Sequence, residues 1–537
     1  MTEHQDLYGK LKAYAEDGRY PWHMPGHKRH ASGFIDPFRF DITEIEGFDD
    51  LHHPEGILRD AMGLAGDLYG SGRSWFLVNG STCGILAGLY AACRPGGRLL
   101  MARNCHKSAY HGALLLDAEV SYVYPDMMEP GFYGILKPET VEAAFRKDSR
   151  ISAMIMVSPG YEGIVSDIRK IAEIVHANGA VLIVDEAHGA HLPFADSQYF
   201  PASALECGAD LVIQSLHKTL PSLTQTAILH MSRECLEEGR ISPGQVSFYL
   251  SVFQSSSPSY VLMASIDRCI RLMAGPQGQQ LMETYARNLR DFRTRMKQSL
   301  KNIHLLDQSD LSLQGGGELR MDPSKIVLWI GENPEDGRQA GGPWLARRLR
   351  DRYHMEPEMV SENYVILMTS PADPKEAYDQ LASALLQMDE ELQTGKETDC
   401  PAAADRGGET TRPGTAGIRH AMHLLPAQAP QAVMSPGKVR DRAEGLKESS
   451  LYRNVRGAEG LVCCDYIYIY PPGLPLLVPG ERIGQAELDV IDGWLEAGLS
   501  VHGLVYGHDC GHGADADAVQ IRCLPDRVLY SHNDADF

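Results

Sequence analysis

Between residue 74 and about residue 230, short apolar runs alternate with segments of helical pattern. Runs of this length, bounded by turn residues, are typical of buried strands. Strands that alternate with helices favour a largely parallel sheet in an α/β fold. In such folds the groups that contact a ligand lie just past the carboxyl ends of the strands. The alternation therefore predicts the fold class and draws attention to the residues that follow each run.

Lys218 follows the apolar run Leu211–Ile213, within the stretch Asp210–Ala227. Pro221 and the Ser and Thr residues after it oppose a helical continuation, so we expect Lys218 on irregular backbone past the strand end. Partial burial lowers the pKa of an ammonium group, and the neutral amine is the form that condenses with an aldehyde. Lys218 is therefore a candidate Schiff-base lysine. The stretch alone is equally compatible with a surface lysine at a strand–loop junction.

A carboxylate, Asp185, ends another apolar run, Val181–Val184. Pyridoxal phosphate (PLP) needs a carboxylate of this kind, because the anion keeps the pyridine nitrogen protonated and the protonated ring accepts electrons. A carboxylate after one strand and a lysine after a later strand is the arrangement of the large aminotransferase-like PLP enzymes. The tetrapeptide DEAH, here Asp185–His188, also occurs in helicases. No GxxxxGK[ST] phosphate-binding motif precedes it, which disfavours a helicase.

Several longer motifs resemble one family, and they occur in the order of that family. DEAHG at Asp185–Gly189 and SLHK at Ser215–Lys218 resemble the Orn/Lys/Arg decarboxylases, the fold-type I PLP-dependent decarboxylases of basic amino acids. PGHK at Pro25–Lys28, the acidic segment Asp41–Leu58 and YPPGLPLLVPGE at Tyr470–Glu481 resemble further segments. The resemblance covers most of the chain. It is to a shorter form, without the N-terminal wing domain of larger members.

The resemblance implies a role for a small set of residues. Lys218 would hold the cofactor, Asp185 would pair with its ring nitrogen, His106 would stack on its ring, and His188 would lie beside it. The cofactor phosphate would be bound by Ser81, Thr82, Ser215, His217 and, from the neighbouring subunit, Ser256. The active site would then be shared, which implies a homodimer or a higher oligomer. The MEPEM segment around Glu358 also matches the family, but no role follows for that glutamate.

Two of these assignments have a structural alternative. Ser81 and Thr82 lie between the strand expected at Ser74–Val78 and the helix expected at Cys83–Cys93. The free N–H groups and the dipole of a helix start attract phosphate, but the same hydroxyls could merely cap the helix. His106 follows another apolar run, and it could likewise be a helix-start histidine that satisfies local backbone groups.

Composition and motif order divide the chain into parts. Residues 399–417 are poor in apolar side chains and rich in Gly, Pro and charge, as in a linker. We expect an N-terminal arm at 1–60, a PLP-binding large domain at 61–290, a smaller α+β domain at 291–395, a flexible linker at 396–417, a C-terminal decarboxylase domain at 418–510 and a tail at 511–537. Within the arm, a short helix is expected at Leu7–Ala15 and a loop at 19–30. The acidic side chains of Asp41–Leu58 could face a cationic substrate or simply cap a helix.

The net charge and the cysteines indicate which partners and which cell compartment to expect. The chain has 50 basic and 71 acidic residues, a formal net charge of −21, which disfavours nucleic acid as a partner. No apolar stretch reaches the roughly 18 residues of a membrane span. The N-terminus lacks a signal-peptide core, and eleven scattered cysteines indicate reduced thiols, so we expect a cytoplasmic protein. His508, Cys510, His512 and Cys523 fit no standard zinc spacing, so no metal is expected.

The function that the resemblance implies is PLP-dependent decarboxylation of lysine, arginine or ornithine to the corresponding amine and carbon dioxide, as in polyamine biosynthesis. One alternative is another reaction on the same cofactor, such as transamination, which would need an arginine that grips the substrate carboxylate. The other is a non-catalytic paralogue that binds partners. The presence of both Asp185 and Lys218 argues against the paralogue. The donor of the α-carbon proton is left open between Lys218 and a nearby histidine.

Overall fold

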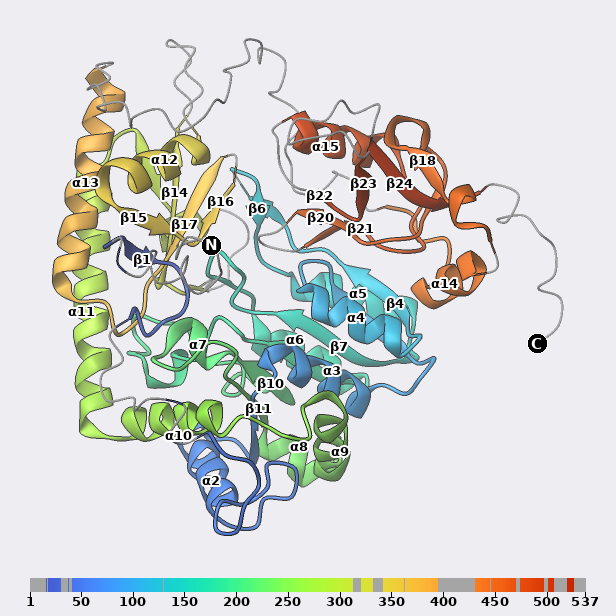
Figure 1. Cartoon of the computed structure of the whole chain (residues 1–537), viewed down its shortest axis with the longest axis horizontal. Coiled ribbons are helices and arrows are strands. Elements are labelled where there is room, and N and C mark those ends of the chain that lie inside the picture. The colour runs from blue at the N-terminus through green and yellow to red at the C-terminus, as the bar shows by residue number, and fades with distance from the viewer. Residues whose placement is uncertain are drawn as a thin grey trace, which may run out of the picture. The chain divides into compact units, whose positions relative to one another are not determined.

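The structure is a computed structural model of the chain (Figure 1). It describes residues 16, 18–29, 37, 41–128, 130–311, 320–331, 341–361, 363–394, 430–444, 446–469, 474–496, 501–506 and 519–525. The chain forms two compact units. The first takes in Met1–Gly88, Val157–Ile174 and Leu182–Thr410, and the second takes in Leu89–Met156, Val175–Val181 and Thr411–Phe537. The helix expected at Leu7–Ala15 and the linker at 396–417 lie outside the described residues.

Four strands of the first unit pair in the order β2-β11-β10-β9. They are β2 (Arg73–Leu77), β9 (Val181–Asp185), β10 (Leu211–Gln214) and β11 (Ala227–Met231). β10 runs parallel to β9, whereas β11 is antiparallel to β10 and to β2. All of their residues except Arg73 are buried, which explains why these strands read as continuous apolar runs in the sequence.

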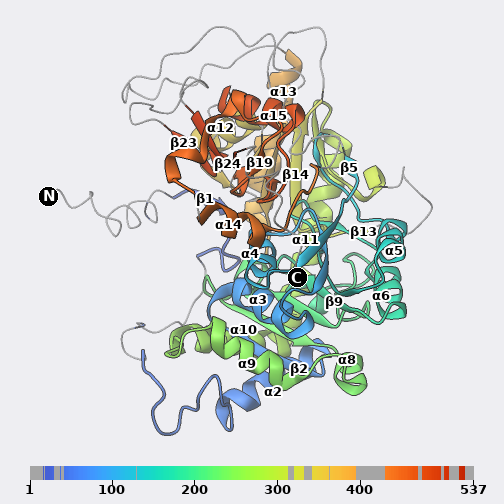
Figure 2. The ribbon, with the colours of Figure 1, turned by 90° about the vertical axis from the view of Figure 1, so that its right-hand side faces the viewer.

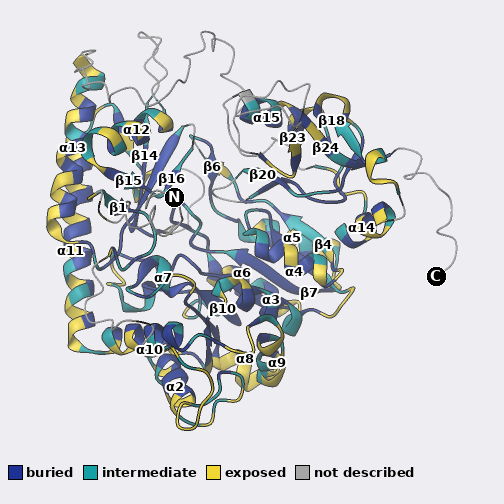
Figure 3. Ribbon diagram, in the orientation of Figure 1, coloured by how far each residue is buried: buried dark blue, intermediate teal, exposed yellow. Residues whose placement is uncertain are grey.

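The long helices of this unit each bury one face. In α11 (Pro276–Ser299) the buried residues Met282, Tyr285, Leu289 and Phe292 recur at intervals of three and four, and Figure 3 shows the exposed opposite face. α11 packs against the helices α10 (Tyr260–Ala274) and α13 (Lys375–Thr394). α2 and α10 pack against each other and against β2 (Figure 2). Among the described residues, the other helices that begin in this unit are α2 (Ile57–Tyr69), α3 (Gly80–Ala92), α6 (Ile168–Ala177), α7 (Leu216–Thr219), α8 (Arg233–Glu238), α9 (Pro243–Phe253) and α12 (Gly342–Tyr353).

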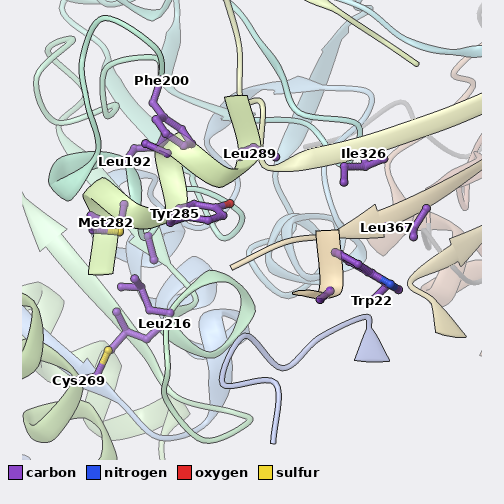
Figure 4. Close-up of a cluster of buried hydrophobic side chains, with 14 of the residues drawn as sticks. Trp22, Leu192, Phe200, Leu216, Cys269, Met282, Tyr285, Leu289, Ile326 and Leu367 are labelled. Carbon is purple, nitrogen blue, oxygen red and sulfur yellow. The ribbon is translucent and has the colours of Figure 1, made fainter. Parts of the chain in front are cut away.

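A second, antiparallel sheet of the first unit has the strand order β12-β14-β17-β16. Its strands are β12 (Ile303–Leu305), β14 (Lys325–Ile330), β16 (Met359–Val360) and β17 (Tyr364–Met368). Two strand pairs complete the unit, β1 (Tyr20–Trp22) parallel to β15 (Met355–Pro357) and β8 (Ile164–Val165) antiparallel to β13 (Arg320–Met321). The prediction of a loop throughout 19–30 is therefore wrong at β1. Trp22 is fully buried in the core beside Ile326 and Leu367 of this sheet (Figure 4), which holds the strand in place.

The second unit contains three parallel strands in the order β7-β3-β4 and an antiparallel C-terminal part. The parallel strands are β3 (Arg98–Ala102), β4 (Glu119–Val123) and β7 (Ile151–Val157), and a short hairpin joins β5 (Met127–Met128) to β6 (Phe132–Tyr133). The C-terminal strands are β18 (Tyr452–Asn454), β19 (Val462–Cys463), β20 (Ile467–Ile469), β21 (Pro475–Leu477), β22 (Val501–His502), β23 (Leu504–Tyr506) and β24 (Val519–Leu524). The helices are α4 (Lys107–Leu115), α5 (Pro138–Lys147), α14 (Pro436–Glu444) and α15 (Gln485–Glu496).

Among the described pairs of strands β2–β4, β7 and β9–β11, three are parallel and two antiparallel. The structure therefore confirms the α/β class with a mainly parallel sheet. The six-part domain division stays a prediction.

Candidate active site

Asp185 is the last residue of β9, at the carboxyl end of that strand. β10 runs parallel to β9, and Ile213 pairs with Asp185, so the chain after β10 leaves the sheet at the same edge. The carboxylate oxygen Oδ1 accepts a hydrogen bond from the N–H of Ala187 at 3.1 Å. Burial raises the pKa of Asp185, while the positive charge of Lys218 opposes that shift. Asp185 and Lys218 therefore lie within electrostatic reach of each other.

Lys218 lies in α7, a single helical turn that follows β10. The prediction of irregular backbone is wrong here, because the N–H of Leu220 bonds to the carbonyl of Leu216 and closes one turn. Pro221 has no N–H and cannot extend the helix, so the turn stays short. The Nζ atom of Lys218 and the Nε2 atom of His188 share a hydrogen bond of 3.0 Å. The histidine of DEAHG and the lysine of SLHK are therefore in contact.

The charges around Lys218 act in opposite directions. Burial lowers its pKa most strongly, and the positive charge of Lys325 adds to the lowering. The carboxylates of Asp185 and Glu358 raise the pKa, but the net direction is down. A lowered pKa leaves more of the amine neutral, which is the nucleophilic form.

Tyr161 and Glu358 continue the series of contacts that begins with Lys218 and His188. The sequence analysis gave a role to neither residue. The ring of Tyr161 meets that of His188 edge-on, with centroids 4.8 Å apart. The hydroxyl of Tyr161 donates to Oε1 of Glu358 at 2.6 Å. The MEPEM segment was a signal for Glu358, because it matched the family. Tyr161 lies two residues beyond Pro159 in the loop after β7, and no sequence signal marked it.

A buried ion pair of Lys325 and Asp322 lies next to His188. The Nζ atom of Lys325 donates to Oδ2 of Asp322 and to the hydroxyl of Ser324, both at 2.7 Å, and to the carbonyl of His188 at 3.2 Å. His191 completes the network, with Nε2 at 3.2 Å from Oδ1 of Asp322. Burial opposes ionisation of Asp322, yet Lys325 and His191 hold its pKa well below the ordinary value. Sequence reasoning missed this network, because a lysine that opens an apolar strand is not a recognisable motif.

The start of α3 follows the end of β2 and contains Ser81 and Thr82. Gly80 adopts a positive φ of 73°, and its N–H donates to the carbonyl of Gln225 at 3.0 Å. Ser81 is half-buried and Thr82 is exposed. α3 has 13 residues, so its first turn carries the positive end of a full helix dipole. The local geometry suits a phosphate group and also an ordinary helix cap.

Ser215 and His217 flank the start of the turn that carries Lys218. The hydroxyl of Ser215 is fully buried and has no hydrogen-bond partner among the described residues. A buried hydroxyl is costly to leave unpaired, so this position suits a bound acceptor. The Nδ1 atom of His217 lies 2.8 Å from the carbonyl of Thr226, so Nδ1 carries a proton. Burial lowers the pKa of His217 to about 4, which keeps the ring neutral.

Ser256 and His106 lie far from Lys218 in the sequence. Ser256 is exposed in the loop between α9 and α10, where the N–H of Ser255 lies 3.5 Å from Oδ1 of Asn79, at the start of α3. His106 is the N-cap of α4 in the second unit, and its Nδ1 atom accepts from the N–H of Ser108 at 3.3 Å. The helix-start alternative therefore describes the local contacts of His106.

The acidic segment before α2 favours the capping alternative at one residue. The carboxylate of Asp49 accepts hydrogen bonds from the N–H groups of Asp50, Glu55, Gly56 and Leu58, at 2.8–3.0 Å. Burial opposes the shift, but these four bonds lower the pKa of Asp49 to about 2. Asp49 thus holds the loop against the start of α2.

Within the described ranges, no three His, Cys, Asp or Glu side chains are grouped as they would be around a metal ion. Cys523 is buried in β24, and His508, Cys510 and His512 lie outside those ranges. No helix in the same part of the chain has both the length and the apolar character that crossing a bilayer requires.

Comparison with known proteins gives matches over nearly the whole chain. Residues 5–376 match the family model for the Orn/Lys/Arg decarboxylase major domain, and residues 420–501 match that for its C-terminal domain. The chain is 32% identical over 505 residues to the uncharacterized protein YaaO of Bacillus subtilis, which covers 93% of this chain and 95% of that protein. It is 29% identical over 524 residues to the arginine decarboxylase of Bacillus subtilis, which covers 94% of this chain and 96% of that protein.

Among solved structures, lysine decarboxylase A from Pseudomonas aeruginosa is similar, with a TM-score of 0.72 at 18% identity. The similarity covers 96% of this chain and 80% of that chain. At this identity it is the fold that is shared, and it confirms the fold class predicted from the sequence.

Proposed function

The chain belongs to the Orn/Lys/Arg decarboxylase family of PLP-dependent carboxy-lyases, and from this premise we propose that it decarboxylates arginine. The observation that carries the proposal is the convergence of Asp185, His188 and Lys218 in one polar cluster, in which Asp185 and His188 are buried and Lys218 is half-buried. Arginine is the first candidate because the relative named arginine decarboxylase aligns over nearly all of both chains. The likeness to the lysine decarboxylase structure concerns the fold alone. Lysine and ornithine are the competing substrates.

The residues of this site fit PLP, which when bound supplies an electron sink for the bond to the departing carboxylate. Lys218 would hold the cofactor through Nζ, and Asp185 would pair with the ring nitrogen. Ser215 would donate its buried hydroxyl to the phosphate, which would satisfy an atom that has no partner among the described residues. The further residues proposed to hold the cofactor are Ser81, Thr82, His106, His188, His217 and the partner subunit's Ser256.

The lysine and the histidine of the cluster are suited to proton transfer. The lowered pKa of Lys218 raises the fraction of its amine that is neutral and can act as a base and nucleophile. Nε2 of His188, at 3.0 Å from Nζ, can exchange a proton with that amine. We propose that this pair holds the proton that the α carbon takes up after the carboxylate has left. The positive charge of Lys218 counteracts the rise that burial causes in the pKa of Asp185, and an ionised Asp185 would favour a proton on the ring nitrogen with which it would pair.

The proposal extends to the assembly and setting of the protein. We propose a cytoplasmic homodimer that acts in polyamine biosynthesis and keeps the six-part domain division expected from the sequence. Ser256 would enter the partner's site. Subunits with Lys218→Ala mixed with subunits with Ser256→Ala would then regain activity, because each mixed dimer contains one complete site. If Ser256 serves its own chain, the mixture stays as inactive as the separate variants.

The test of the reaction is release of carbon dioxide from carboxyl-labelled arginine, lysine and ornithine, with PLP supplied. Lys218→Ala should abolish release, whereas Lys170→Ala, at an exposed lysine of α6, should leave it unchanged. Release from lysine or ornithine in place of arginine would overturn the substrate. No release from any of the three, with the visible absorbance of bound cofactor intact, would overturn decarboxylation, and transamination of the same substrates would then be measured.

A further inference from the structure

Glu358, between β15 and β16, is fixed by contacts from three separate segments. Its N–H donates to the carbonyl of Ile366 on the neighbouring strand at 2.9 Å. Its Oε2 atom accepts from the N–H of Met24 at 2.8 Å, and its Oε1 atom accepts from the hydroxyl of Tyr161 at 2.6 Å. Both carboxylate oxygens thus accept from donors that are distant from Glu358 in the sequence. A half-buried carboxylate held from both sides has a defined position.

Two side chains, those of Tyr161 and His188, connect Glu358 to Lys218. Tyr161 donates to Glu358 through its hydroxyl, and its ring packs edge-on against the ring of His188, with an interplanar angle of 60°. His188 in turn shares its hydrogen bond with Lys218. Because the hydroxyl of Tyr161 is anchored at one end, the ring that touches His188 has a fixed orientation.

We propose that Glu358, acting through Tyr161, is a positioning residue for the His188–Lys218 pair. The inference rests on the proposed function, since it assigns a task within that same site. It has two separable parts. The hydrogen bond to Tyr161 fixes the geometry of the pair, and the carboxylate charge favours the ammonium form of Lys218.

The effect of the Glu358 charge on Lys218 follows from the groups that shift the pKa of this lysine. Asp185 from β9 and Glu358 favour the ammonium form, whereas Lys325 from β14 and burial disfavour it, and His188 is the hydrogen-bond partner. Glu358 is therefore one of two carboxylates that counter the lowering of the pKa of Lys218. Removing its charge while keeping its size would raise the neutral fraction of the amine at a given pH.

Backbone N–H groups of the N-terminal segment donate hydrogen bonds at or next to both ends of the series from Glu358 to Lys218. Besides the bond from Met24 to Glu358, the N–H of Gly26 donates to the carbonyl of His217 at 2.7 Å, next to Lys218. The hydroxyl of Ser370 donates to the carbonyl of Gly26 at 2.6 Å. A Cβ atom at Gly26 would lie 3.0 Å from the backbone of Leu220, so any side chain at this position would press on the turn that carries Lys218. The PGHK motif, which had no role from sequence, thus supports the same site.

The experiment compares Glu358→Gln and Tyr161→Phe with the control Glu356→Gln. Glu356 lies two residues away and pairs with Arg350 at 2.6 Å and Arg19 at 3.6 Å, outside the series. PLP is added to cofactor-free protein, and the rate at which visible absorbance appears is followed from pH 6 to pH 9. The kcat and KM of decarboxylation are measured in parallel.

The two variants should differ in a way that a general loss of structure would not produce. Glu358→Gln should capture PLP about threefold or more faster at pH 7, with its rate profile moved to lower pH, because it lacks the charge that favours the ammonium form. Tyr161→Phe keeps that charge, so its profile should stay in place. Both variants should lower kcat about tenfold with little change in KM, because the pair is less well oriented.

Other results would overturn the proposal. If both variants match Glu356→Gln in the capture profile and in kcat, Glu358 does not position the pair. If Glu358→Gln does not fold by circular dichroism, Tyr161→Phe decides alone, and a kcat equal to that of the unmodified protein rejects the proposal. Absence of a visible band and of carbon dioxide release in the unmodified protein would instead count against the proposed function.

Discussion

Each compact unit contains a buried ion pair, and the pKa of the carboxylate is shifted in opposite directions in the two pairs. Asp322 and Lys325 in the first unit are 2.7 Å apart, and Arg103 and Glu481 in the second are 2.9 Å apart. All four side chains are 2% exposed or less. Nevertheless, the pKa of Asp322 is well below its ordinary value, while burial raises the pKa of Glu481 above it.

The difference lies in how completely the two carboxylates are hydrogen-bonded. Asp322 accepts from Lys325 and from the hydroxyl of Ser324 on one oxygen, and it meets His191 and the N–H of Ser324 on the other. Glu481 accepts from Arg103 and the N–H of Val478 on Oε2, whereas Oε1 has no partner among the described residues. A single opposite charge thus fails to offset burial, and donors on both oxygens succeed.

The largest expected loss of stability follows from breaking the pair of Asp322 and Lys325, in which both carboxylate oxygens are hydrogen-bonded. Lys325→Met would leave the buried carboxylate of Asp322 without its main counter-charge, so we expect a loss of about 3–5 kcal/mol in the free energy of unfolding. Urea unfolding at pH 7 measures it. The control Lys375→Met removes an exposed lysine that pairs with Asp379 on α13, and it should cost no more than about 1 kcal/mol. Equal losses in the two variants would show that the hydrogen bonds around Lys325 add nothing.

Arg103→Met should cost less, about 2–3 kcal/mol at pH 8. Glu481 already has a raised pKa, so after the change it can take up a proton instead of remaining as an unpaired charge. The loss should therefore be smaller at pH 5 than at pH 8. A loss that exceeds that of Lys325→Met, or one that is the same at both pH values, would contradict the comparison.

The two carboxylates should give the pH dependence of stability opposite signs. The folded pKa of Asp322 is lowered, so its contribution is present above about pH 3.9, the unfolded value, and is lost as the pH falls. The folded pKa of Glu481 is raised, so its contribution is present below about pH 4.3 and is lost as the pH rises through the folded pKa. Each effect has a limiting slope of about 1.4 kcal/mol per pH unit.

Urea midpoints from pH 3 to pH 8 separate these contributions. Asp322→Asn should flatten the acid side of the stability profile, and Glu481→Gln should flatten the fall above about pH 4.3. If both variants changed the same side, hydrogen bonding would not explain the difference between the two pairs.

The sequence predicted those parts of the fold and site that depend on local patterns. β2, β9 and the helix α3 are read from apolar runs in the sequence, and each lies close to the predicted bounds. Asp185 and Lys218 were found in the same way, because a strand end marks both.

The parts that sequence reasoning missed depend on contacts between distant segments. β1 exists because Trp22 is buried in a core built by α11 and the antiparallel sheet. Tyr161, Glu358 and Lys325 come from a loop, a strand junction and a strand of the second sheet. No period or spacing in one sequence connects them to His188. Without a family role attached to them, only the folded structure brings these side chains to the site.

The smallest predicted effect on the free energy of unfolding comes from the aromatic ring beside the guanidinium of Arg103. Its Nε and Nη1 atoms have no hydrogen-bond partner among the described residues, but its guanidinium lies over the ring of Tyr122, 4.8 Å from the centroid. Tyr122→Leu should therefore lower the free energy of unfolding by about 1 kcal/mol, and Tyr122→Phe, which keeps the aromatic face, should change it much less. In the Arg103→Met background, Tyr122→Leu should lose part of its effect, because the cation is gone. An identical cost in both backgrounds would mean that the ring only fills space. The guanidinium would then be stabilised by its bonds to Glu481 and the carbonyl of Leu476 and by the ring of Tyr110, whose centroid lies 5.8 Å away.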